Sequence, residues 1–143
     1  MTIFIDADGC PVVDIVIELA SLAKAKCVIV CDTSHVFEKP NATTVTVSKG
    51  SDSVDFALVN MIKKGDIAVT QDYGLAAMCL ARMATTINQD GLLYTKDNID
   101  GLLMQRYAAK KIRMAGGRLK GPKKRTPQQN MAFEKSLRSI LQI

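Results

Sequence analysis

Carboxylates and a hydroxyl group follow two apolar runs of the sequence, at points where strands are expected to end. Asp6 and Asp8 come directly after the first apolar run, and Thr70 and Asp72 follow the run IAV. Ligands of open α/β sheets bind beyond the carboxyl ends of the strands, where the strand order reverses. If these two strands are neighbours, the four side chains open onto one crevice. A buried strand that ends in a carboxylate needs a partner for that charge, which favours a functional role for Asp6.

Two further acids, Asp52 and Asp55, open an expected amphipathic helix. Val59 and Ile62 follow Asp55 at four and seven residues, so this spacing places Asp55 on the helix face that points to the sheet. Several carboxylates that meet there repel one another unless a cation is shared between them. Oxygen-only ligands suit Mg²⁺ or Mn²⁺, which bind phosphate oxygens and activate water. For Asp52 helix capping is an equal alternative, with Asp55 as the acidic residue of a capping box.

Strands that alternate with helices position these residues. Strands are expected at 2–6, 26–32, 42–49, 66–71 and 84–88, and helices at 11–24, 51–65, 73–83 and 97–114, with a last helix that begins at Thr126 and Pro127. Pro11 is expected in the first turn of the first helix. This alternation is typical of βαβ units around a mostly parallel sheet. At 143 residues, the chain is expected to form one α/β domain, 1–143.

Charge divides the chain into an acidic body, 1–104, and a basic helical extension, 105–143. The body has eight Lys and Arg against 13 Asp and Glu, whereas the extension has eleven Lys and Arg against one acid. A basic segment on an acidic body favours contact with a polyanion, here nucleic acid. A solvated helical face with a basic loop is the alternative. The candidate nucleic-acid-binding residues are Arg113, Arg118, Lys120, Lys123, Lys124 and Arg125.

Other site classes find little support in the sequence. His35 is the one histidine, and the four cysteines include no CxxC pair, which argues against a zinc site and against a nucleophile that needs a histidine base. Cys27 and Cys31 alternate onto one face of a strand and are expected as buried thiols. No apolar run reaches the ~18 residues that span a bilayer, and Asp6 interrupts any signal-peptide core. A cytoplasmic protein without a membrane partner is therefore expected.

The motifs, taken in order, resemble the YaiI/YqxD family of uncharacterised bacterial proteins, which belongs to the PIN-like nuclease group. The matching segments are DADGCPV (6–12), GSDSVDFALV (50–59), GDIAVTQDYGLAA (65–77), YTKDNID (94–100) and GPK (121–123). Gly9 stands where alanine is more frequent in this family, and Gly74 where proline is. The resemblance implies a PIN-like three-layer α/β/α fold in which the first and fourth strands are neighbours.

The resemblance also implies roles for the acids. In PIN-like nucleases, acids after the first strand, on a middle helix and after the fourth strand hold a divalent metal. By position these are Asp6, Asp55 and Asp72, with Asp52 as an additional candidate ligand. Asp8 is a further acid of the family's opening motif, and Thr70 matches the small hydroxyl residue that precedes the last acid.

Three functions are weighed on these grounds. The first is a metal-dependent nuclease, with RNA favoured, that uses Mg²⁺ or Mn²⁺ to cleave phosphodiester bonds at the acids. The second is an RNA-binding protein that retains the fold without catalysis. The third is a small phosphohydrolase of the haloacid-dehalogenase type, because FIDADG is similar to the opening of that class. The sequence does not offer a convincing lysine or the second acidic pair that this third chemistry needs.

Overall fold

The computed structural model describes residues 1–50, 52–118 and 123–143, which form six strands and five helices. The strands are β1 (Thr2–Asp6), β2 (Lys26–Asp32), β3 (Thr43–Val47), β4 (Ile67–Val69), β5 (Thr85–Ile87) and β6 (Leu93–Tyr94). The helices are α1 (Val13–Leu22), α2 (Ser53–Met61), α3 (Tyr73–Ala81), α4 (Lys96–Met114) and α5 (Pro127–Leu141). Among these helices none combines the length and the apolarity that a membrane crossing requires.

The six strands form one sheet in the order β3-β2-β1-β4-β5-β6. Neighbouring strands are parallel except for β5 and β6, which are antiparallel. Strand β1 pairs with β4, with Ile3 opposite Ile67 and Ile5 opposite Val69. The expected α/β class with a mostly parallel sheet is confirmed, as is the expectation that the first and fourth strands are neighbours. The carboxyl ends of β1 and β4 therefore meet at one edge of the sheet.

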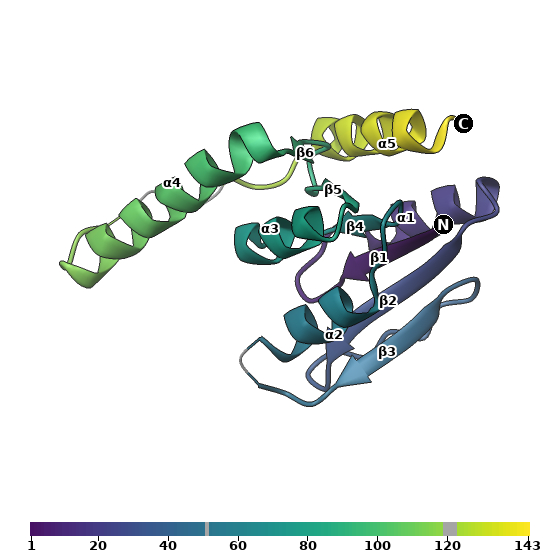
Figure 1. The fold of residues 1–143 in the computed structure, drawn as a ribbon, viewed down its shortest axis with the longest axis horizontal. Coiled ribbons are helices and arrows are strands. Elements are labelled where there is room, and N and C mark those ends of the chain that lie inside the picture. Colours follow the sequence, from purple (N-terminus) through teal and green to yellow (C-terminus); the bar gives the residue numbers. More distant parts are fainter. Residues whose placement is uncertain (51, 119–122) are drawn as a thin grey trace.

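Helices cover both faces of the sheet and give three layers (Figure 1). Alternate residues of β1 point to opposite faces, since Ile3 and Ile5 pack in the core shared with α1 and α5, whereas Phe4 packs with α2 and α3. Phe133 of α5 is fully buried in the first of these cores. The α5 helix of the basic extension is thus part of the layered body. Cys27 and Cys31 are both buried in this core, as expected.

Helix α4 extends away from the other helices (Figure 1). Its first turns pack on α3, where Ile99 joins Ala76 and Tyr94 in a small buried cluster. Thr95 caps its start, because its side chain accepts a hydrogen bond from the Asn98 N–H, and the Asn98 side-chain oxygen accepts one from the Thr95 N–H. The remainder of α4 after Leu103 is mostly exposed.

Some boundaries differ from those expected. Pro11 lies directly before the N-cap residue Val12 and so outside the first turn of α1, and it follows a turn closed by the Cys10 N–H and the Ala7 carbonyl. The first helical bond runs from Val16 N to Val12 O. Strand β4 is shorter than the expected 66–71, and its ladder ends at Val69. The start of α5 at Pro127, with Thr126 in a capping box, is confirmed.

Candidate active site

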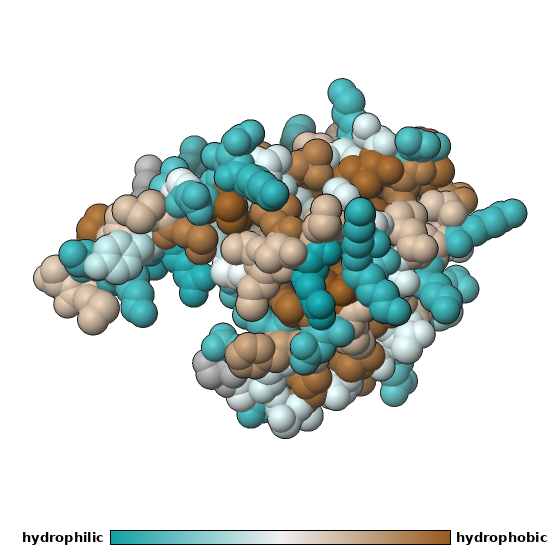
Figure 2. Space-filling view, viewed as in Figure 1, coloured by the Kyte–Doolittle hydropathy of each residue, from teal (hydrophilic) through white to brown (hydrophobic). Residues whose placement is uncertain are grey.

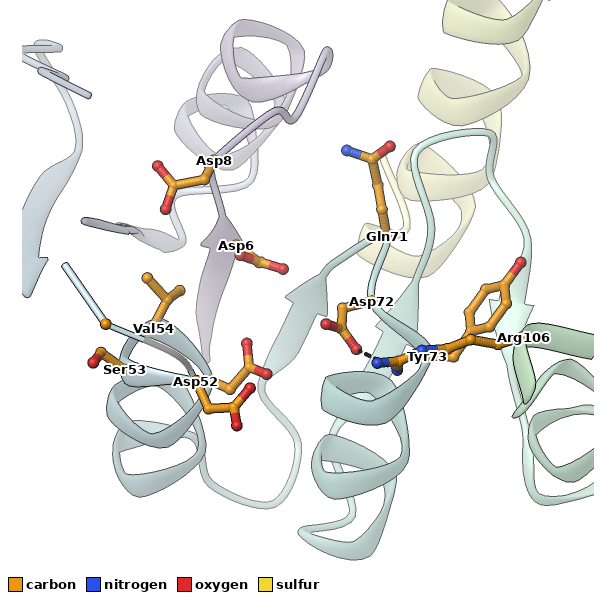
Figure 3. Close-up of a pocket in the computed structure, with 11 residues that line it drawn as sticks. Asp6, Asp8, Asp52, Ser53, Val54, Gln71, Asp72, Tyr73 and Arg106 are labelled. Carbon is orange, nitrogen blue, oxygen red and sulfur yellow. Dashed lines mark hydrogen bonds and ion pairs between the residues drawn. The ribbon is translucent and has the colours of Figure 1, made fainter. Parts of the chain in front are cut away.

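A cavity of about 560 Å³ opens at the carboxyl edge of the sheet, between the ends of β1 and β4 and the start of α2. Five carboxylates line it, those of Asp6, Asp8, Asp52, Asp55 and Asp72. Figure 3 shows Asp6 at the tip of β1, Asp52 on one side of it and Asp72 on the other. The topology therefore collects acids from three distant segments at one place.

The carboxylate of Asp6 is held by the end of the neighbouring strand. Thr70 Oγ1 donates a hydrogen bond of 2.7 Å to Asp6 Oδ2. Thr70 Oγ1 also accepts a hydrogen bond of 3.0 Å from the backbone N–H of Asp72. Thr70 is only 1% exposed, so its hydroxyl has no access to solvent. Burial raises the pKa of Asp6, and the nearby charges of Asp72 and Asp8 raise it further, against the hydrogen bond from Thr70. Thr70 is a positioning residue for Asp6.

Asp72 has two contacts besides the cavity. Its Oδ1 accepts hydrogen bonds from the backbone N–H groups of Gly74 and Leu75 at 2.8 and 3.1 Å, which caps α3. Proline at position 74 would lack the first of these donors. Arg106 of α4 also reaches Asp72, with Nη1 3.4 Å from Oδ1 (Figure 3). Arg106 lines the cavity and was not predicted as a site residue.

Asp52 and Asp55 lie at the start of α2. Burial, together with the charges of Asp72, Asp6 and Asp52, raises the pKa of Asp55 to about 6, against the charge of Arg106. Asp52 occupies the N-cap position with φ of 64°, but its side chain makes no capping hydrogen bond. The N-cap position expected for Asp52 is therefore confirmed, whereas the side-chain hydrogen bond of a cap is absent. Its left-handed backbone leaves the carboxylate beside the cavity.

Asp8 links the cavity to the loop after β2. Its Oδ2 accepts a hydrogen bond of 3.1 Å from the backbone N–H of Asp32, and its Oδ1 lies 2.7 Å from His35 Nδ1. The second contact lacks the geometry of a hydrogen bond, and Oδ1, which is shielded from solvent, accepts no hydrogen bond from the residues that the structure describes. Within the described ranges, Asp8, Asp32 and His35 are the one set of three His, Cys, Asp or Glu residues whose ligand atoms lie within 4.8 Å of one another. The other four acids line the cavity without such close approach.

Known proteins similar to this chain were found over its full length. The model of a family described as "Uncharacterized BCR, YaiI/YqxD family" matches residues 4–143. A UPF0178 protein of Exiguobacterium sibiricum is 53% identical over 141 residues, which cover 99% of this chain and 96% of the relative. A UPF0178 protein of Clostridium acetobutylicum is 45% identical over 143 residues, which cover 99% and 97%. No solved structure matches the chain significantly.

The chain belongs to the YaiI/YqxD family. The resemblance read from the motifs is thereby confirmed at the level of the family, which is an uncharacterised one.

The basic residues of this YaiI/YqxD protein fall into two groups. Arg113, Arg118, Lys123 and Lys124 are exposed, whereas Lys120 lies outside the described residues. Arg125 is half-buried, and its Nε, Nη1 and Nη2 atoms each donate a hydrogen bond within the protein. Its guanidinium group lies 2.7 Å from the Asp90 carboxylate and donates to the Gln89 carbonyl and the Asn130 side chain. Arg125 thus links the start of α5 to the loop between β5 and β6. Its side chain bonds to the protein itself, unlike the exposed basic residues that are available to bind phosphate.

The donor set of this YaiI/YqxD cavity fits a hard divalent cation. Every candidate ligand offers carboxylate oxygen, the kind of donor that Mg²⁺ and Mn²⁺ prefer. The acids also disfavour one another's ionised form, since the charge of Asp72 raises the pKa of both Asp6 and Asp55. A shared cation would relieve this repulsion. The shielded Oδ1 of Asp8, 2.7 Å from His35 Nδ1, is a further oxygen that accepts no hydrogen bond from the described part of the chain.

Proposed function

We propose that this YaiI/YqxD protein is a divalent-metal-dependent nuclease that hydrolyses phosphodiester bonds, with RNA as the favoured substrate. One observation carries the proposal: carboxylates from the ends of β1 and β4 and from the start of α2 line a single open cavity. Ionised acids gathered at one place repel one another, so the arrangement is costly without a cation. The grouping with PIN-like nucleases, which the motifs suggested, belongs to this proposal.

The proposed metal ligands are Asp6, Asp55 and Asp72, with Asp52 as a supporting ligand. Mg²⁺ or Mn²⁺ bound there would activate water and stabilise negative charge on the phosphoryl group. Thr70 keeps the Asp6 carboxylate directed at the cavity through the 2.7 Å hydrogen bond. Asp8 lines the same cavity, and its carboxylate is available to orient water.

Arg106 supplies positive charge at the rim of the cavity. Its side chain is 58% exposed and its Nη1 lies 3.4 Å from Asp72 Oδ1, so it pairs with that acid while it remains accessible to a phosphate. Arginine binds phosphate oxygens with two parallel N–H donors. We assign Arg106 the role of holding the substrate phosphate next to the acids.

The test compares the wild-type protein with Asp6→Asn on end-labelled RNA and DNA panels, with Mg²⁺, Mn²⁺ or EDTA. Asp14→Asn is the matched control, because Asp14 is an exposed acid of α1 that pairs with Lys39 and does not line the cavity. We expect cleavage by the wild type and by Asp14→Asn with a divalent metal, and loss of cleavage in EDTA and in Asp6→Asn.

Equal cleavage by wild type and Asp6→Asn would identify a contaminating nuclease and contradict the proposal. No cleavage by any of the three, combined with RNA binding that survives in Asp6→Asn, would favour the alternative of an RNA-binding protein without catalysis.

A further inference from the structure

Helix α4 changes in character along one of its faces. Ile99, Leu103, Arg106, Lys110 and Arg113 follow at spacings of four, three, four and three residues, which places them on one face. The first two belong to the apolar cluster that packs α4 on α3. The same face of α4 is therefore apolar where the helix packs on α3 and cationic further along, at Arg106, Lys110 and Arg113. Arg106, Lys110 and Arg113 are called the α4 stripe below.

The α4 stripe is open to a partner. Helix α4 extends away from the other helices (Figure 1), and its residues after Leu103 are mostly exposed. Lys110 and Arg113 are exposed, and within the part of the chain that the structure describes neither takes part in an ion pair. The acids of α4, Asp97 and Asp100, occupy other faces of the helix. Lys110 and Arg113, three residues apart on this face, repel each other, and an anionic partner removes that cost.

The α4 stripe begins at the candidate active site. Arg106 lines the cavity beside Asp72, and Arg113 follows it by seven residues, a rise of about 10 Å along the helix axis. That length corresponds to about three stacked nucleotides at ~3.4 Å per nucleotide. A polyanion with one phosphate at the cavity therefore has its next phosphates within reach of Lys110 and Arg113.

Exposed apolar side chains of α4 lie on a side of the helix next to the α4 stripe. Met104, Tyr107 and Met114 follow at spacings of three and seven residues, which places them on one side of α4. In Figure 2, which has the same view as Figure 1, hydrophilic side chains interrupt the hydrophobic ones along the projecting part of α4. The cations of the stripe and these apolar side chains therefore form separate surfaces.

We propose that the α4 stripe binds the phosphodiester backbone of an RNA strand on one side of the bond at the cavity. The inference rests on the proposed function for the identity of the ligand and adds the surface that holds it. Lys110 and Arg113 contact phosphates through charge and do not read bases, so binding along the stripe is independent of sequence.

The test measures binding of a fluorescently labelled single-stranded RNA in EDTA, where cleavage does not contribute. The double variant Lys110→Ala/Arg113→Ala removes two phosphate contacts. We expect its affinity to fall about tenfold or more, and the slope of log K against log salt, between about 50 and 200 mM, to decrease by about 1.4. Alanine favours helix, so α4 is retained, which circular dichroism checks. Lys110→Gln/Arg113→Gln, which keeps long side chains, should show the same loss.

The matched control is Lys63→Ala/Lys64→Ala, which removes two exposed cations from the turn before β4, at the opposite edge of the sheet. This control should keep the wild-type affinity and salt slope. A stripe variant that binds like the wild type, two double variants that weaken binding equally, or a wild type that binds no RNA would each overturn the inference.

Failure of this inference is separable from failure of the nuclease proposal. Selective loss of binding in the stripe variant, with no metal-dependent cleavage by the wild type, supports the stripe and rejects catalysis. Metal-dependent cleavage that is lost in Asp6→Asn, with unchanged binding by the stripe variant, rejects the stripe and supports the nuclease.

Discussion

Thr70 Oγ1 donates a 2.7 Å hydrogen bond to Asp6 Oδ2, and so joins the ends of β4 and β1 across 64 residues of sequence. The parallel pairing of these strands, with Ile5 opposite Val69, makes the contact possible, because the next residue of each strand reaches the same edge. Since Thr70 Oγ1 also accepts the Asp72 N–H, one buried hydroxyl sets the placement of two of the proposed metal ligands. The geometry of the site thus depends on a residue that does not touch solvent.

Replacement of this hydroxyl should weaken the site without removing an acid. Thr70→Val keeps the shape of the side chain but leaves Asp6 without its donor. Loss of a hydrogen bond that orients a metal ligand typically costs about 10–100-fold in metal affinity or activity. We expect a reduction of that size in Mn²⁺ affinity, measured by calorimetric titration.

Thr70→Ser is the control, because serine retains the donor. Its Mn²⁺ affinity should remain within a few-fold of wild type. Equal losses in the valine and serine variants would show that packing, and not the hydroxyl, determines the effect.

Asp72 should show separable structural and metal-binding roles. Asp72→Asn keeps an oxygen for the N–H groups of Gly74 and Leu75, whereas Asp72→Ala removes the cap, at a cost of roughly 0.5–2 kcal/mol in unfolding free energy. Both variants should lose Mn²⁺ affinity, because neither keeps the carboxylate. Urea unfolding and metal titration on the same samples check the two roles. An asparagine variant that binds Mn²⁺ as tightly as wild type would remove Asp72 from the ligand set.

Sequence alone was sufficient to predict the elements that carry the site. The apolar runs and the amphipathic spacing are local signals, so the order of strands and helices and the parallel sheet followed from them. The ends were less accurate, as with Pro11, which lies in a turn before α1. The first helical hydrogen bond runs from Val16 N to Val12 O, so the helix starts too late for Pro11 to occupy its first turn.

Contacts between distant segments were not readable in the same way. Arg106 contacts Asp72 across 34 residues of sequence, and no local sequence pattern predicts that contact. His35 likewise meets Asp8 only because β2 lies beside β1. Asp72 and Asp52 both occupy N-cap positions, but only the Asp72 side chain accepts hydrogen bonds from the first turn of its helix. The sequence context of the two acids is similar, so spacing does not reveal this difference or the left-handed backbone of Asp52.

Arg125 should contribute more to stability than to binding. Its ion pair with Asp90 and its hydrogen bond to the Gln89 carbonyl fasten the start of α5, so Arg125→Ala should lower the unfolding free energy by about 1–2 kcal/mol. The neighbouring Lys124→Ala, which removes an exposed cation, should change it by less than about 0.5 kcal/mol. Urea unfolding of the two variants measures the difference. Equal stability of both would contradict this structural role.

The raised pKa of Asp55 should make the metal-free protein less stable as the pH increases. The pKa is about 6 in the folded protein against an ordinary value of 3.8, so the folded state retains the proton longer than the unfolded chain does. Folding stability therefore falls as the pH rises from about 4 to about 6, and then stays level with respect to this group. Asp55→Asn removes this penalty.

In EDTA, we expect the Tm of Asp55→Asn to exceed that of wild type by roughly 2–4 °C at about pH 7.5, and the two values to converge near pH 4. Differential scanning fluorimetry over this pH range measures the change. Excess Mn²⁺ at about pH 7.5 should raise the Tm of wild type more than that of Asp55→Asn, because only the wild type keeps the full ligand set and bound metal stabilises the folded state. A Tm difference that is constant with pH and insensitive to Mn²⁺ would show that the Asp55 carboxylate neither repels its neighbours nor binds the metal.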